Sequence, residues 1–234
     1  MRKLMSLATI LLLVVSCGSD NERGTAQEIS FTPNDIDMFM AQLSNTSTNL
    51  RVGQKKIFRE QSKRKGYNGN LCLYWTTVTE EITSSAVSAF DGLTDLQLRK
   101  TRKSELFPNQ PYSCSKFSAR DGVFSRYVSQ TDLIYNLRDN IRRYIDHDYR
   151  CRKMRRRCVN SRLISATEGM IGEVPVVRVV TQYDRAIRNG RTFSTQLTSY
   201  VSKRNLFEGV LKFEKRNLNT NEVTEVRDFL FTTL

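Results

Sequence analysis

Turn signals in the last third of the chain require an antiparallel sheet in any fold that this sequence adopts. Four runs rich in β-branched and aromatic residues alternate there with turns. The stronger turn signal is Asn189-Gly190, a dipeptide typical of two-residue hairpin loops, and the other turn spans residues 217–221. Four sequential strands with short connections predict a meander. The strands are expected at residues 174–188, 191–204, 207–216 and 222–231.

The first hairpin also predicts a register. A two-residue loop at Asn189-Gly190 places Val179 opposite Tyr200 and Ala186 opposite Phe193. Because side chains alternate between the two faces of a sheet, this register determines which side chains meet.

The most regular helical pattern lies between Thr131 and Cys158. Apolar side chains recur there at helical spacing, so a continuous helix would gather them on one broad face. We therefore predict one long helix that packs on the sheet. The apolar face consists of Leu133, Ile134, Leu137, Ile141, Tyr144, Cys151, Met154 and Cys158.

The first half of the domain predicts shorter elements. The pattern indicates an amphipathic helix ending near Leu43, a hairpin over residues 50–79, and a short strand near residues 123–128. Two further segments, 82–90 and 95–106, are predicted as short helices. The resulting fold class is α+β: an antiparallel sheet, made of the C-terminal four-strand meander plus an N-terminal hairpin, packed against a long helix.

The N-terminus has the pattern of an export signal. Arg2 and Lys3 precede an apolar run over residues 4–15 that is too short for a transmembrane helix. The run ends in Val14-Val15-Ser16-Cys17, which resembles the lipobox of bacterial lipoprotein precursors. The resemblance implies that the Cys17 thiol is diacylated, that the preceding peptide is removed, and that the new amino terminus is acylated, for example with palmitate.

This resemblance implies a domain organisation and a location. Residues 1–16 would be the lipoprotein signal peptide, 17–31 a lipidated flexible tether, and 32–234 a single α+β domain. The protein would be lipid-anchored in the bacterial cell envelope. Gly18 is not aspartate, which in lipoproteins of Gram-negative bacteria favours the outer membrane over the inner one. The alternatives are an ordinary secretory peptide, in which Cys17 is incidental, and an uncleaved anchor.

The composition predicts a partner rich in negative charge. The chain carries 37 Lys and Arg against 24 Asp and Glu, a net charge of +13, and about +11 remains once Arg2 and Lys3 leave with the signal peptide. Such a surface attracts polyanions. Besides the membrane that holds the lipid on Cys17, we expect contact with anionic lipid, lipopolysaccharide, cell-wall polymer or a protein partner, and not with nucleic acid. A solvated basic surface without a specific ligand is the alternative.

Four cysteines remain beside Cys17, and an even number in an exported chain predicts two disulfides, with three connectivities open. On one continuous helix the last two would lie about 10 Å apart, which is beyond disulfide reach. Either the helix breaks and these two pair, or both pair elsewhere. Zinc is the alternative, but the tight Cys-x2-Cys spacing of structural sites is missing, so we predict no metal. The four are Cys72, Cys114, Cys151 and Cys158.

A dense basic cluster between Arg150 and Arg157 is the candidate binding site. Six of these eight residues are basic, and no acidic residue occurs from Tyr149 to Thr167. Like charges this close repel one another, so a bound anion would relieve the repulsion. The arginine fork suits phosphate and carboxylate groups. A solvated helix end is the alternative. The predicted anion-binding residues are Arg150, Arg152, Lys153, Arg155, Arg156 and Arg157.

The sequence contains no recognisable catalytic or cofactor motif, so we predict no catalytic residue and no cofactor. His147 is the only histidine, and on a helix its side chain and those of Asp146 and Asp148 diverge by about 100° per step, so no charge relay among the three is implied. Glu80 and Glu81 would face opposite sides of a strand. We therefore predict a non-enzymatic binding or structural module for an anionic partner, of otherwise undetermined activity. An envelope hydrolase with a site assembled from scattered residues is the alternative, and an acid and a nucleophile converging on His147 would favour it.

Overall fold

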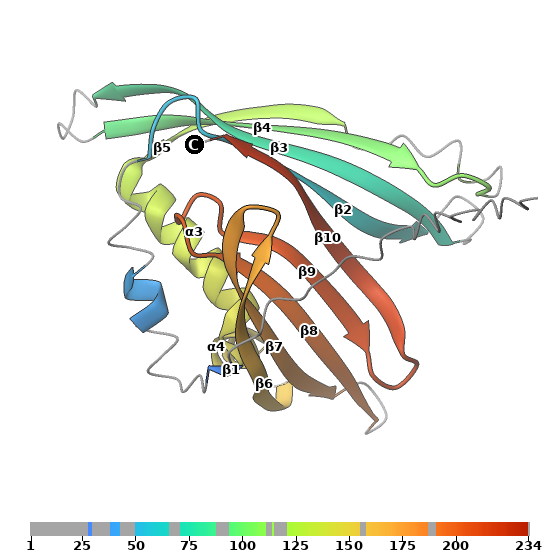
Figure 1. Cartoon of the computed structure of the whole chain (residues 1–234). Coiled ribbons are helices and arrows are strands. Elements are labelled where there is room, and N and C mark those ends of the chain that lie inside the picture. Colours follow the sequence, from blue (N-terminus) through green and yellow to red (C-terminus); the bar gives the residue numbers. More distant parts are fainter. Residues whose placement is uncertain are drawn as a thin grey trace, which may run out of the picture.

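One antiparallel sheet contains all ten strands that the computed structural model describes (Figure 1). The described residues are 28–29, 38–42, 50–65, 71–87, 94–110, 114, 121–154, 158–186 and 191–233. The strands are β1 (Glu28–Ile29), β2 (Lys55–Lys65), β3 (Leu71–Val87), β4 (Thr94–Leu106), β5 (Gly122–Ser129), β6 (Cys158–Ile171), β7 (Val174–Ala186), β8 (Thr192–Ser202), β9 (Val210–Asn217) and β10 (Glu222–Thr233). Their order across the sheet is β1-β6-β7-β8-β9-β10-β2-β3-β4-β5.

Two meanders, β2–β5 and β6–β10, join at a seam between β10 and β2. Val226 of β10 lies opposite Gln61 of β2 in the antiparallel register of this seam. Across the seam, Arg227 Nε donates a hydrogen bond to Glu60 Oε1 at 3.0 Å, and the Arg227 guanidinium lies 4.2 Å from the centre of the Phe58 ring. The charge-assisted hydrogen bond and the cation–π contact both stabilise the joint between the two halves.

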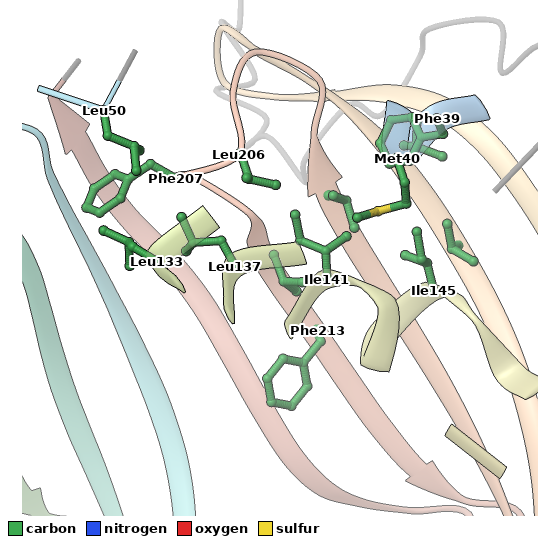
Figure 2. Packing of buried hydrophobic residues seen from close by; sticks show 14 of the residues in the cluster. Phe39, Met40, Leu50, Leu133, Leu137, Ile141, Ile145, Leu206, Phe207 and Phe213 are labelled. Carbon is green, nitrogen blue, oxygen red and sulfur yellow. The ribbon is translucent and has the colours of Figure 1, made fainter. Parts of the chain in front are cut away.

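Helix α3 (Gln130–Ile145) crosses the concave side of the sheet (Figure 1). It begins after Ser129, whose Oγ accepts a hydrogen bond from the Asp132 N–H at 3.1 Å. The side chains of its buried face recur every four residues, and they join a core that includes side chains from β3, β4, β7, β8 and β9 (Figure 2). Burying each aliphatic side chain contributes about 1.5–3 kcal/mol, so this face holds the curved sheet together. The face consists of Leu133, Leu137, Ile141 and Ile145.

Asp146 breaks the helix that we predicted between Thr131 and Cys158. Its N–H donates to the Arg142 carbonyl at the end of α3, while its Oδ1 accepts a hydrogen bond from the Tyr149 N–H at 2.8 Å and so caps helix α4 (His147–Met154). Aspartate favours such capping positions because its short side chain competes for backbone hydrogen bonds. Two helices of moderate length therefore replace the predicted long one.

The predicted helices at residues 82–90 and 95–106 are also wrong. Residues 82–87 of the first segment continue β3, which is 17 residues long, and the second segment forms β4. Residues 88–90 lie outside the described residues. In β4 the buried Leu96 and the partly buried Leu98 are two residues apart, which is the period of a strand rather than a helix. The α+β fold class is therefore corrected. The four-strand meander and the hairpin are parts of one continuous sheet that dominates the protein, and the helices are small.

The predicted register of the β7–β8 hairpin is wrong by one residue. Val179 lies opposite Ser199, and Ala186 lies opposite Thr192. The connection spans the five residues 187–191 rather than two, and an odd number shifts the pairing by one. The Asn189-Gly190 dipeptide itself lies outside the described residues.

The cysteines of the domain form two disulfides. Cys72 of β3 is bonded to Cys114, and Cys151 of α4 is bonded to Cys158, the first residue of β6. Of the two alternatives that the sequence left open, the first holds, because the helix ends before Cys158 and the chain there enters β6.

The structure also describes the end of the predicted tether. Glu28 and Ile29 form β1, opposite Thr167 and Ala166 of β6. Residues 1–27, with the lipobox and Cys17, lie outside the described residues. Among the helices that are described, none is both long and apolar enough to cross a membrane.

Candidate functional site

A basic segment closed by a disulfide connects α4 to β6. The Cα atoms of Cys151 and Cys158 are 5.3 Å apart, and five of the six residues between them are basic. Arg152 and Lys153 are exposed at the end of α4, whereas residues 155–157, the three consecutive arginines, lie outside the described residues. The disulfide holds both ends of this segment, which we call the basic loop (residues 152–157), at one place on the molecule.

The structure separates Arg150 from the rest of the predicted cluster. Its guanidinium lies 5.0 Å from the ring centre of Tyr183 on β7 and 5.8 Å from that of Tyr144 on α3. Its Nη1 atom is buried and has no hydrogen-bond partner among the described residues. Cation–π contacts of this kind contribute about 0.5–2 kcal/mol each. Arg150 therefore packs α4 onto the sheet. Among the described members of the predicted basic cluster, Arg152 and Lys153 are the ones that face solvent.

Asp139 fastens α4 to α3. The Tyr149 hydroxyl donates to Asp139 Oδ1, and the Arg143 guanidinium donates to Asp139 Oδ2. Burial acts to raise the pKa of Asp139, but the hydrogen bonds from Tyr149 and Arg143 outweigh it and hold the pKa below its ordinary value. Lys153 Nζ lies 5.2 Å from the centre of the Tyr149 ring. These contacts fix the orientation of the helix that precedes the basic loop.

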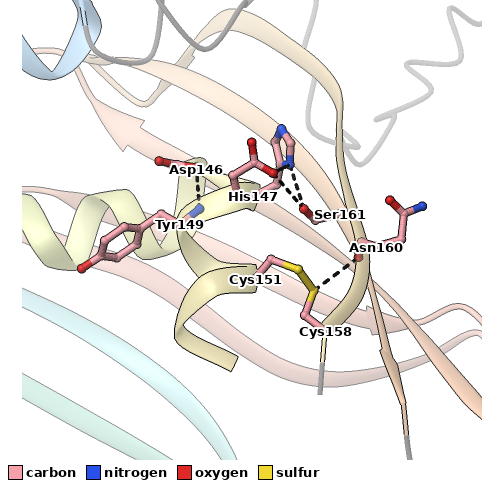
Figure 3. The surroundings of a disulfide bond; sticks show 8 residues. Asp146, His147, Tyr149, Cys151, Cys158, Asn160 and Ser161 are labelled. Carbon is pink, nitrogen blue, oxygen red and sulfur yellow. Dashed lines mark hydrogen bonds and ion pairs between the residues drawn. A yellow bond between two sulfur atoms is a disulfide. The ribbon is translucent and has the colours of Figure 1, made fainter. Parts of the chain in front are cut away.

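His147 lies beside an acid and a hydroxyl (Figure 3). Its Nδ1 is 3.1 Å from Ser161 Oγ and 3.2 Å from Asp148 Oδ1, and Ser161 Oγ also donates to Asp148 Oδ1 at 3.2 Å. In a hydrolytic triad the acid and the nucleophile contact different nitrogens of the ring, so that the histidine can accept a proton from the nucleophile while the acid orients it. Here both contact Nδ1, so the three residues do not form a triad.

Ser161 is a neighbour of His147 that the sequence pattern did not predict. The two residues are 14 positions apart, and only the return of the chain through β6 brings them together. The pattern predicted no strand at β6, so nothing in the sequence indicated this contact.

A second charged cluster lies in the β2–β5 half of the sheet. Glu80 Oε2 is 3.1 Å from Lys56 Nζ, and Glu80 Oε1 accepts a hydrogen bond from Lys100 Nζ at 2.6 Å. Burial acts to raise the pKa of Glu80, but the two lysines outweigh it and lower the pKa to about 2. Lys56 Nζ also donates to the Phe207 carbonyl at 2.9 Å. Because the partners are protein groups, this cluster stabilises the sheet rather than offering a free carboxylate.

The part of the chain that the structure describes holds no group of three or more His, Cys, Asp or Glu side chains that could bind a metal ion.

No protein-family model and no curated protein matches the sequence of this chain. A crystal structure of a Bacteroides fragilis protein, thought to be exported and having a YmcC-like fold, matches with a TM-score of 0.36 and 8% identity, over 79% of this chain and 97% of the other. Similarity at this level carries no argument about fold, location or activity.

Proposed function

We propose that this protein is a lipid-anchored, non-enzymatic protein of the bacterial envelope that binds phosphate-bearing anions through its basic loop. The observation that carries the proposal is the closure by Cys151–Cys158 of a six-residue segment with five basic residues. The ligand chemistry is phosphate on a lipid headgroup, a lipopolysaccharide or a cell-wall polymer.

Electrostatics support an anion at this place. Positive charges held within one short loop repel one another, and a phosphate group bound among them relieves the repulsion. Arginine binds phosphate through two parallel hydrogen bonds. The disulfide restricts the loop before binding, which lowers the entropy that a ligand must overcome.

The tether length favours the headgroups of the anchoring membrane. From Cys17 to Glu28 the chain advances 11 residues, which span at most about 36–40 Å when extended. From Thr167, which pairs with Glu28, to Cys158 the strand β6 runs nine residues, or about 30 Å. The basic loop is therefore within reach of a membrane to which Cys17 is attached.

The test compares two matched double variants. Arg152→Gln/Lys153→Gln removes the exposed Arg-Lys pair of the basic loop, and Arg102→Gln/Lys103→Gln removes an exposed Arg-Lys pair on β4. Binding of the unlipidated chain from Gly18 onward to phosphatidylglycerol vesicles should fall about thirtyfold in the first variant, since two basic residues near such a surface together contribute about 2 kcal/mol. It should fall much less in the second. Equal losses would show that only the bulk charge acts.

The same assay separates the sources of phosphate. Binding should weaken steeply between 0.1 M and 1 M salt, as the screening length falls from about 10 Å to about 3 Å. Tighter binding to lipopolysaccharide or to soluble cell-wall polymer than to vesicles would assign the ligand to those molecules instead. A triple variant, with Arg155, Arg156 and Arg157 changed to Gln, should lose more affinity than the same change at residues 63–65.

The lipid anchor has its own test. In cells, Cys17→Ser should yield a soluble protein or an unprocessed precursor, because the thiol is the proposed acylation point. Normal acylation and membrane attachment of this variant would contradict the lipoprotein assignment.

A further inference from the structure

The β5 edge of the sheet differs from the β6 edge. β5 is the last strand in the sheet order, and among the described residues no strand pairs with its outer side, whereas β1 pairs with β6 at the opposite edge. A free edge presents a row of backbone N–H and C=O groups to which another strand can bond. The five residues 123–127 of β5 are all exposed.

Three large apolar side chains lie along this free edge. Val123, Phe124 and Tyr127 have exposed fractions of 56%, 58% and 61%. The side chain of Phe124 leans along its own strand, because a Cβ added at Gly122 would lie 3.2 Å from its ring atoms. Val123 and Tyr127 are four residues apart and therefore share the other face of the strand. An exposed apolar row on an unpaired strand is the feature that soluble proteins normally avoid.

Basic side chains lie beside β5 on both faces: the exposed Arg99 of β4 lies opposite Ser125, on the face of Val123 and Tyr127, and further cations lie on the other face. Arg126 lies on the same face as Phe124, and the register places Arg102 and Lys100 of β4 opposite Gly122 and Phe124. Lys100 is already paired with Glu80, so Arg102 and Arg126 are the cations that face solvent there. Asp121 accepts a hydrogen bond from the Ser104 N–H at 2.7 Å at the start of the strand.

We propose that β5 accepts an extended acidic segment of another protein as an added strand. Acidic side chains of that segment would contact Arg126 and Arg102 on one face, and its apolar side chains would cover Val123 and Tyr127 on the other. The preferred sequence is thus one that alternates acidic and apolar residues. Main-chain hydrogen bonds supply the affinity in this mode of binding, and the alternate side chains supply the specificity.

Charge argues against a second copy of this chain as the occupant. Pairing of β5 with β5 of another copy would bring Arg126 and Arg102 close to the same residues of the partner copy, and each mature chain carries a net charge of about +11. Like charges across a strand pair are destabilising. An acidic segment instead neutralises them.

The experiment uses the mature protein in zwitterionic detergent and a fluorescein-labelled octapeptide of alternating glutamate and valine. Fluorescence anisotropy should show saturable binding, and hydrogen exchange should show new protection of the β5 amides. An octapeptide of alternating lysine and valine should not bind. Failure of the acidic peptide to bind, or equal binding of the basic one, would overturn the proposal.

Exposed-residue variants localise the contact. Val123→Ser/Tyr127→Ser should weaken binding at least tenfold and Arg126→Gln about threefold, whereas Ile164→Ser/Met170→Ser, which changes exposed apolar residues of β6, should leave binding unchanged. An equal loss in the β6 variant would also overturn the proposal. So would sedimentation showing a dimer that Val123→Ser/Tyr127→Ser abolishes, because β5 would then be an interface between copies. Vesicle binding by the basic loop does not involve β5, so the two proposals fail independently.

Discussion

The two disulfides lie in contrasting places. Cys72 and Cys114 are separated by 42 residues, are only 0% and 1% exposed, and form a small core of their own with Tyr74. Cys151 and Cys158 are separated by seven residues and close the basic loop at the protein surface. Tyr74 Oη also donates a hydrogen bond to the Cys114 carbonyl at 3.3 Å.

The difference indicates that the two disulfides have distinct roles. The main core gathers around α3 and does not include the Cys72–Cys114 cluster, so that end of the β2–β3 pair depends on its own disulfide. The Cys151–Cys158 bond joins α4 to β6, but α4 is already held to β7 by Arg150 and to β6 by the contact of His147 with Ser161. One bond therefore supports the fold, and the other restricts a charged segment.

Removing the buried disulfide should have the largest effect on stability. In Cys72→Ala/Cys114→Ala the free energy of unfolding should fall by about 4 kcal/mol, from the entropy regained by a loop of this length in the unfolded chain. Urea unfolding followed by circular dichroism measures it. A loss no greater than that of Cys151→Ala/Cys158→Ala would contradict the comparison.

Acid should weaken the same half of the sheet. The folded-state pKa of Glu80, about 2, lies below its ordinary value of 4.5, so its contribution is fully present above pH 4.5 and is lost as the pH falls toward 2. The shift corresponds to about 3 kcal/mol. Urea unfolding between pH 5 and pH 2 should show a flatter decline in Glu80→Gln than in the native protein. The matched control is Glu81→Gln, on the adjacent residue, which should follow the native slope.

Removing the surface disulfide should affect binding more than folding. Cys151→Ala/Cys158→Ala should lower the free energy of unfolding by about 2 kcal/mol, because its loop is short. Binding to phosphatidylglycerol vesicles should weaken severalfold, since the opened loop has more conformations to lose. Unchanged vesicle affinity would mean that loop closure does not contribute to anion binding.

The smallest effect should come from the cap of α4. Asp146→Ala removes the carboxylate that accepts the Tyr149 N–H, and a lost cap costs about 1 kcal/mol. Hydrogen exchange at the first amides of α4 should become faster, with little change in global unfolding. Asp146→Asn is the control, because asparagine caps helices as well as aspartate does. Equal exchange rates in Asp146→Ala and the native protein would contradict this role of the cap.

The sequence predicted the strands with clear alternation and missed those without it. Strands β7 to β10 lie within a few residues of their predicted positions because each is a run rich in β-branched and aromatic residues bounded by turns, and in β8 the buried side chains also recur with period two. Strand β6 has a single fully buried residue, Ala166, among partly and fully exposed ones, so no alternation marked it. The far end of β3 and most of β4 are similarly half-exposed, and there the pattern favoured helices.

The candidate site was predictable only as a run of charge. The density of basic residues located the cluster between Arg150 and Arg157. The stacking of Arg150 on Tyr183, however, depends on β7, which lies more than 20 residues further along the chain. The contact of His147 with Ser161 likewise depends on β6. Tertiary packing, which local periodicity does not encode, decides which members of a charged run face solvent.

The seam between β10 and β2 sets an order of events in folding. Glu60 and Arg227, which pair across it, are 167 residues apart, so a long stretch of chain separates β2 from its second neighbour. Contacts of such high sequence separation form slowly, because a long loop must close first. Until β10 arrives, β2 keeps an open edge on which foreign strands can assemble. The pairing of β10 with β2 is thus the step that ends this period of vulnerability to misassembly.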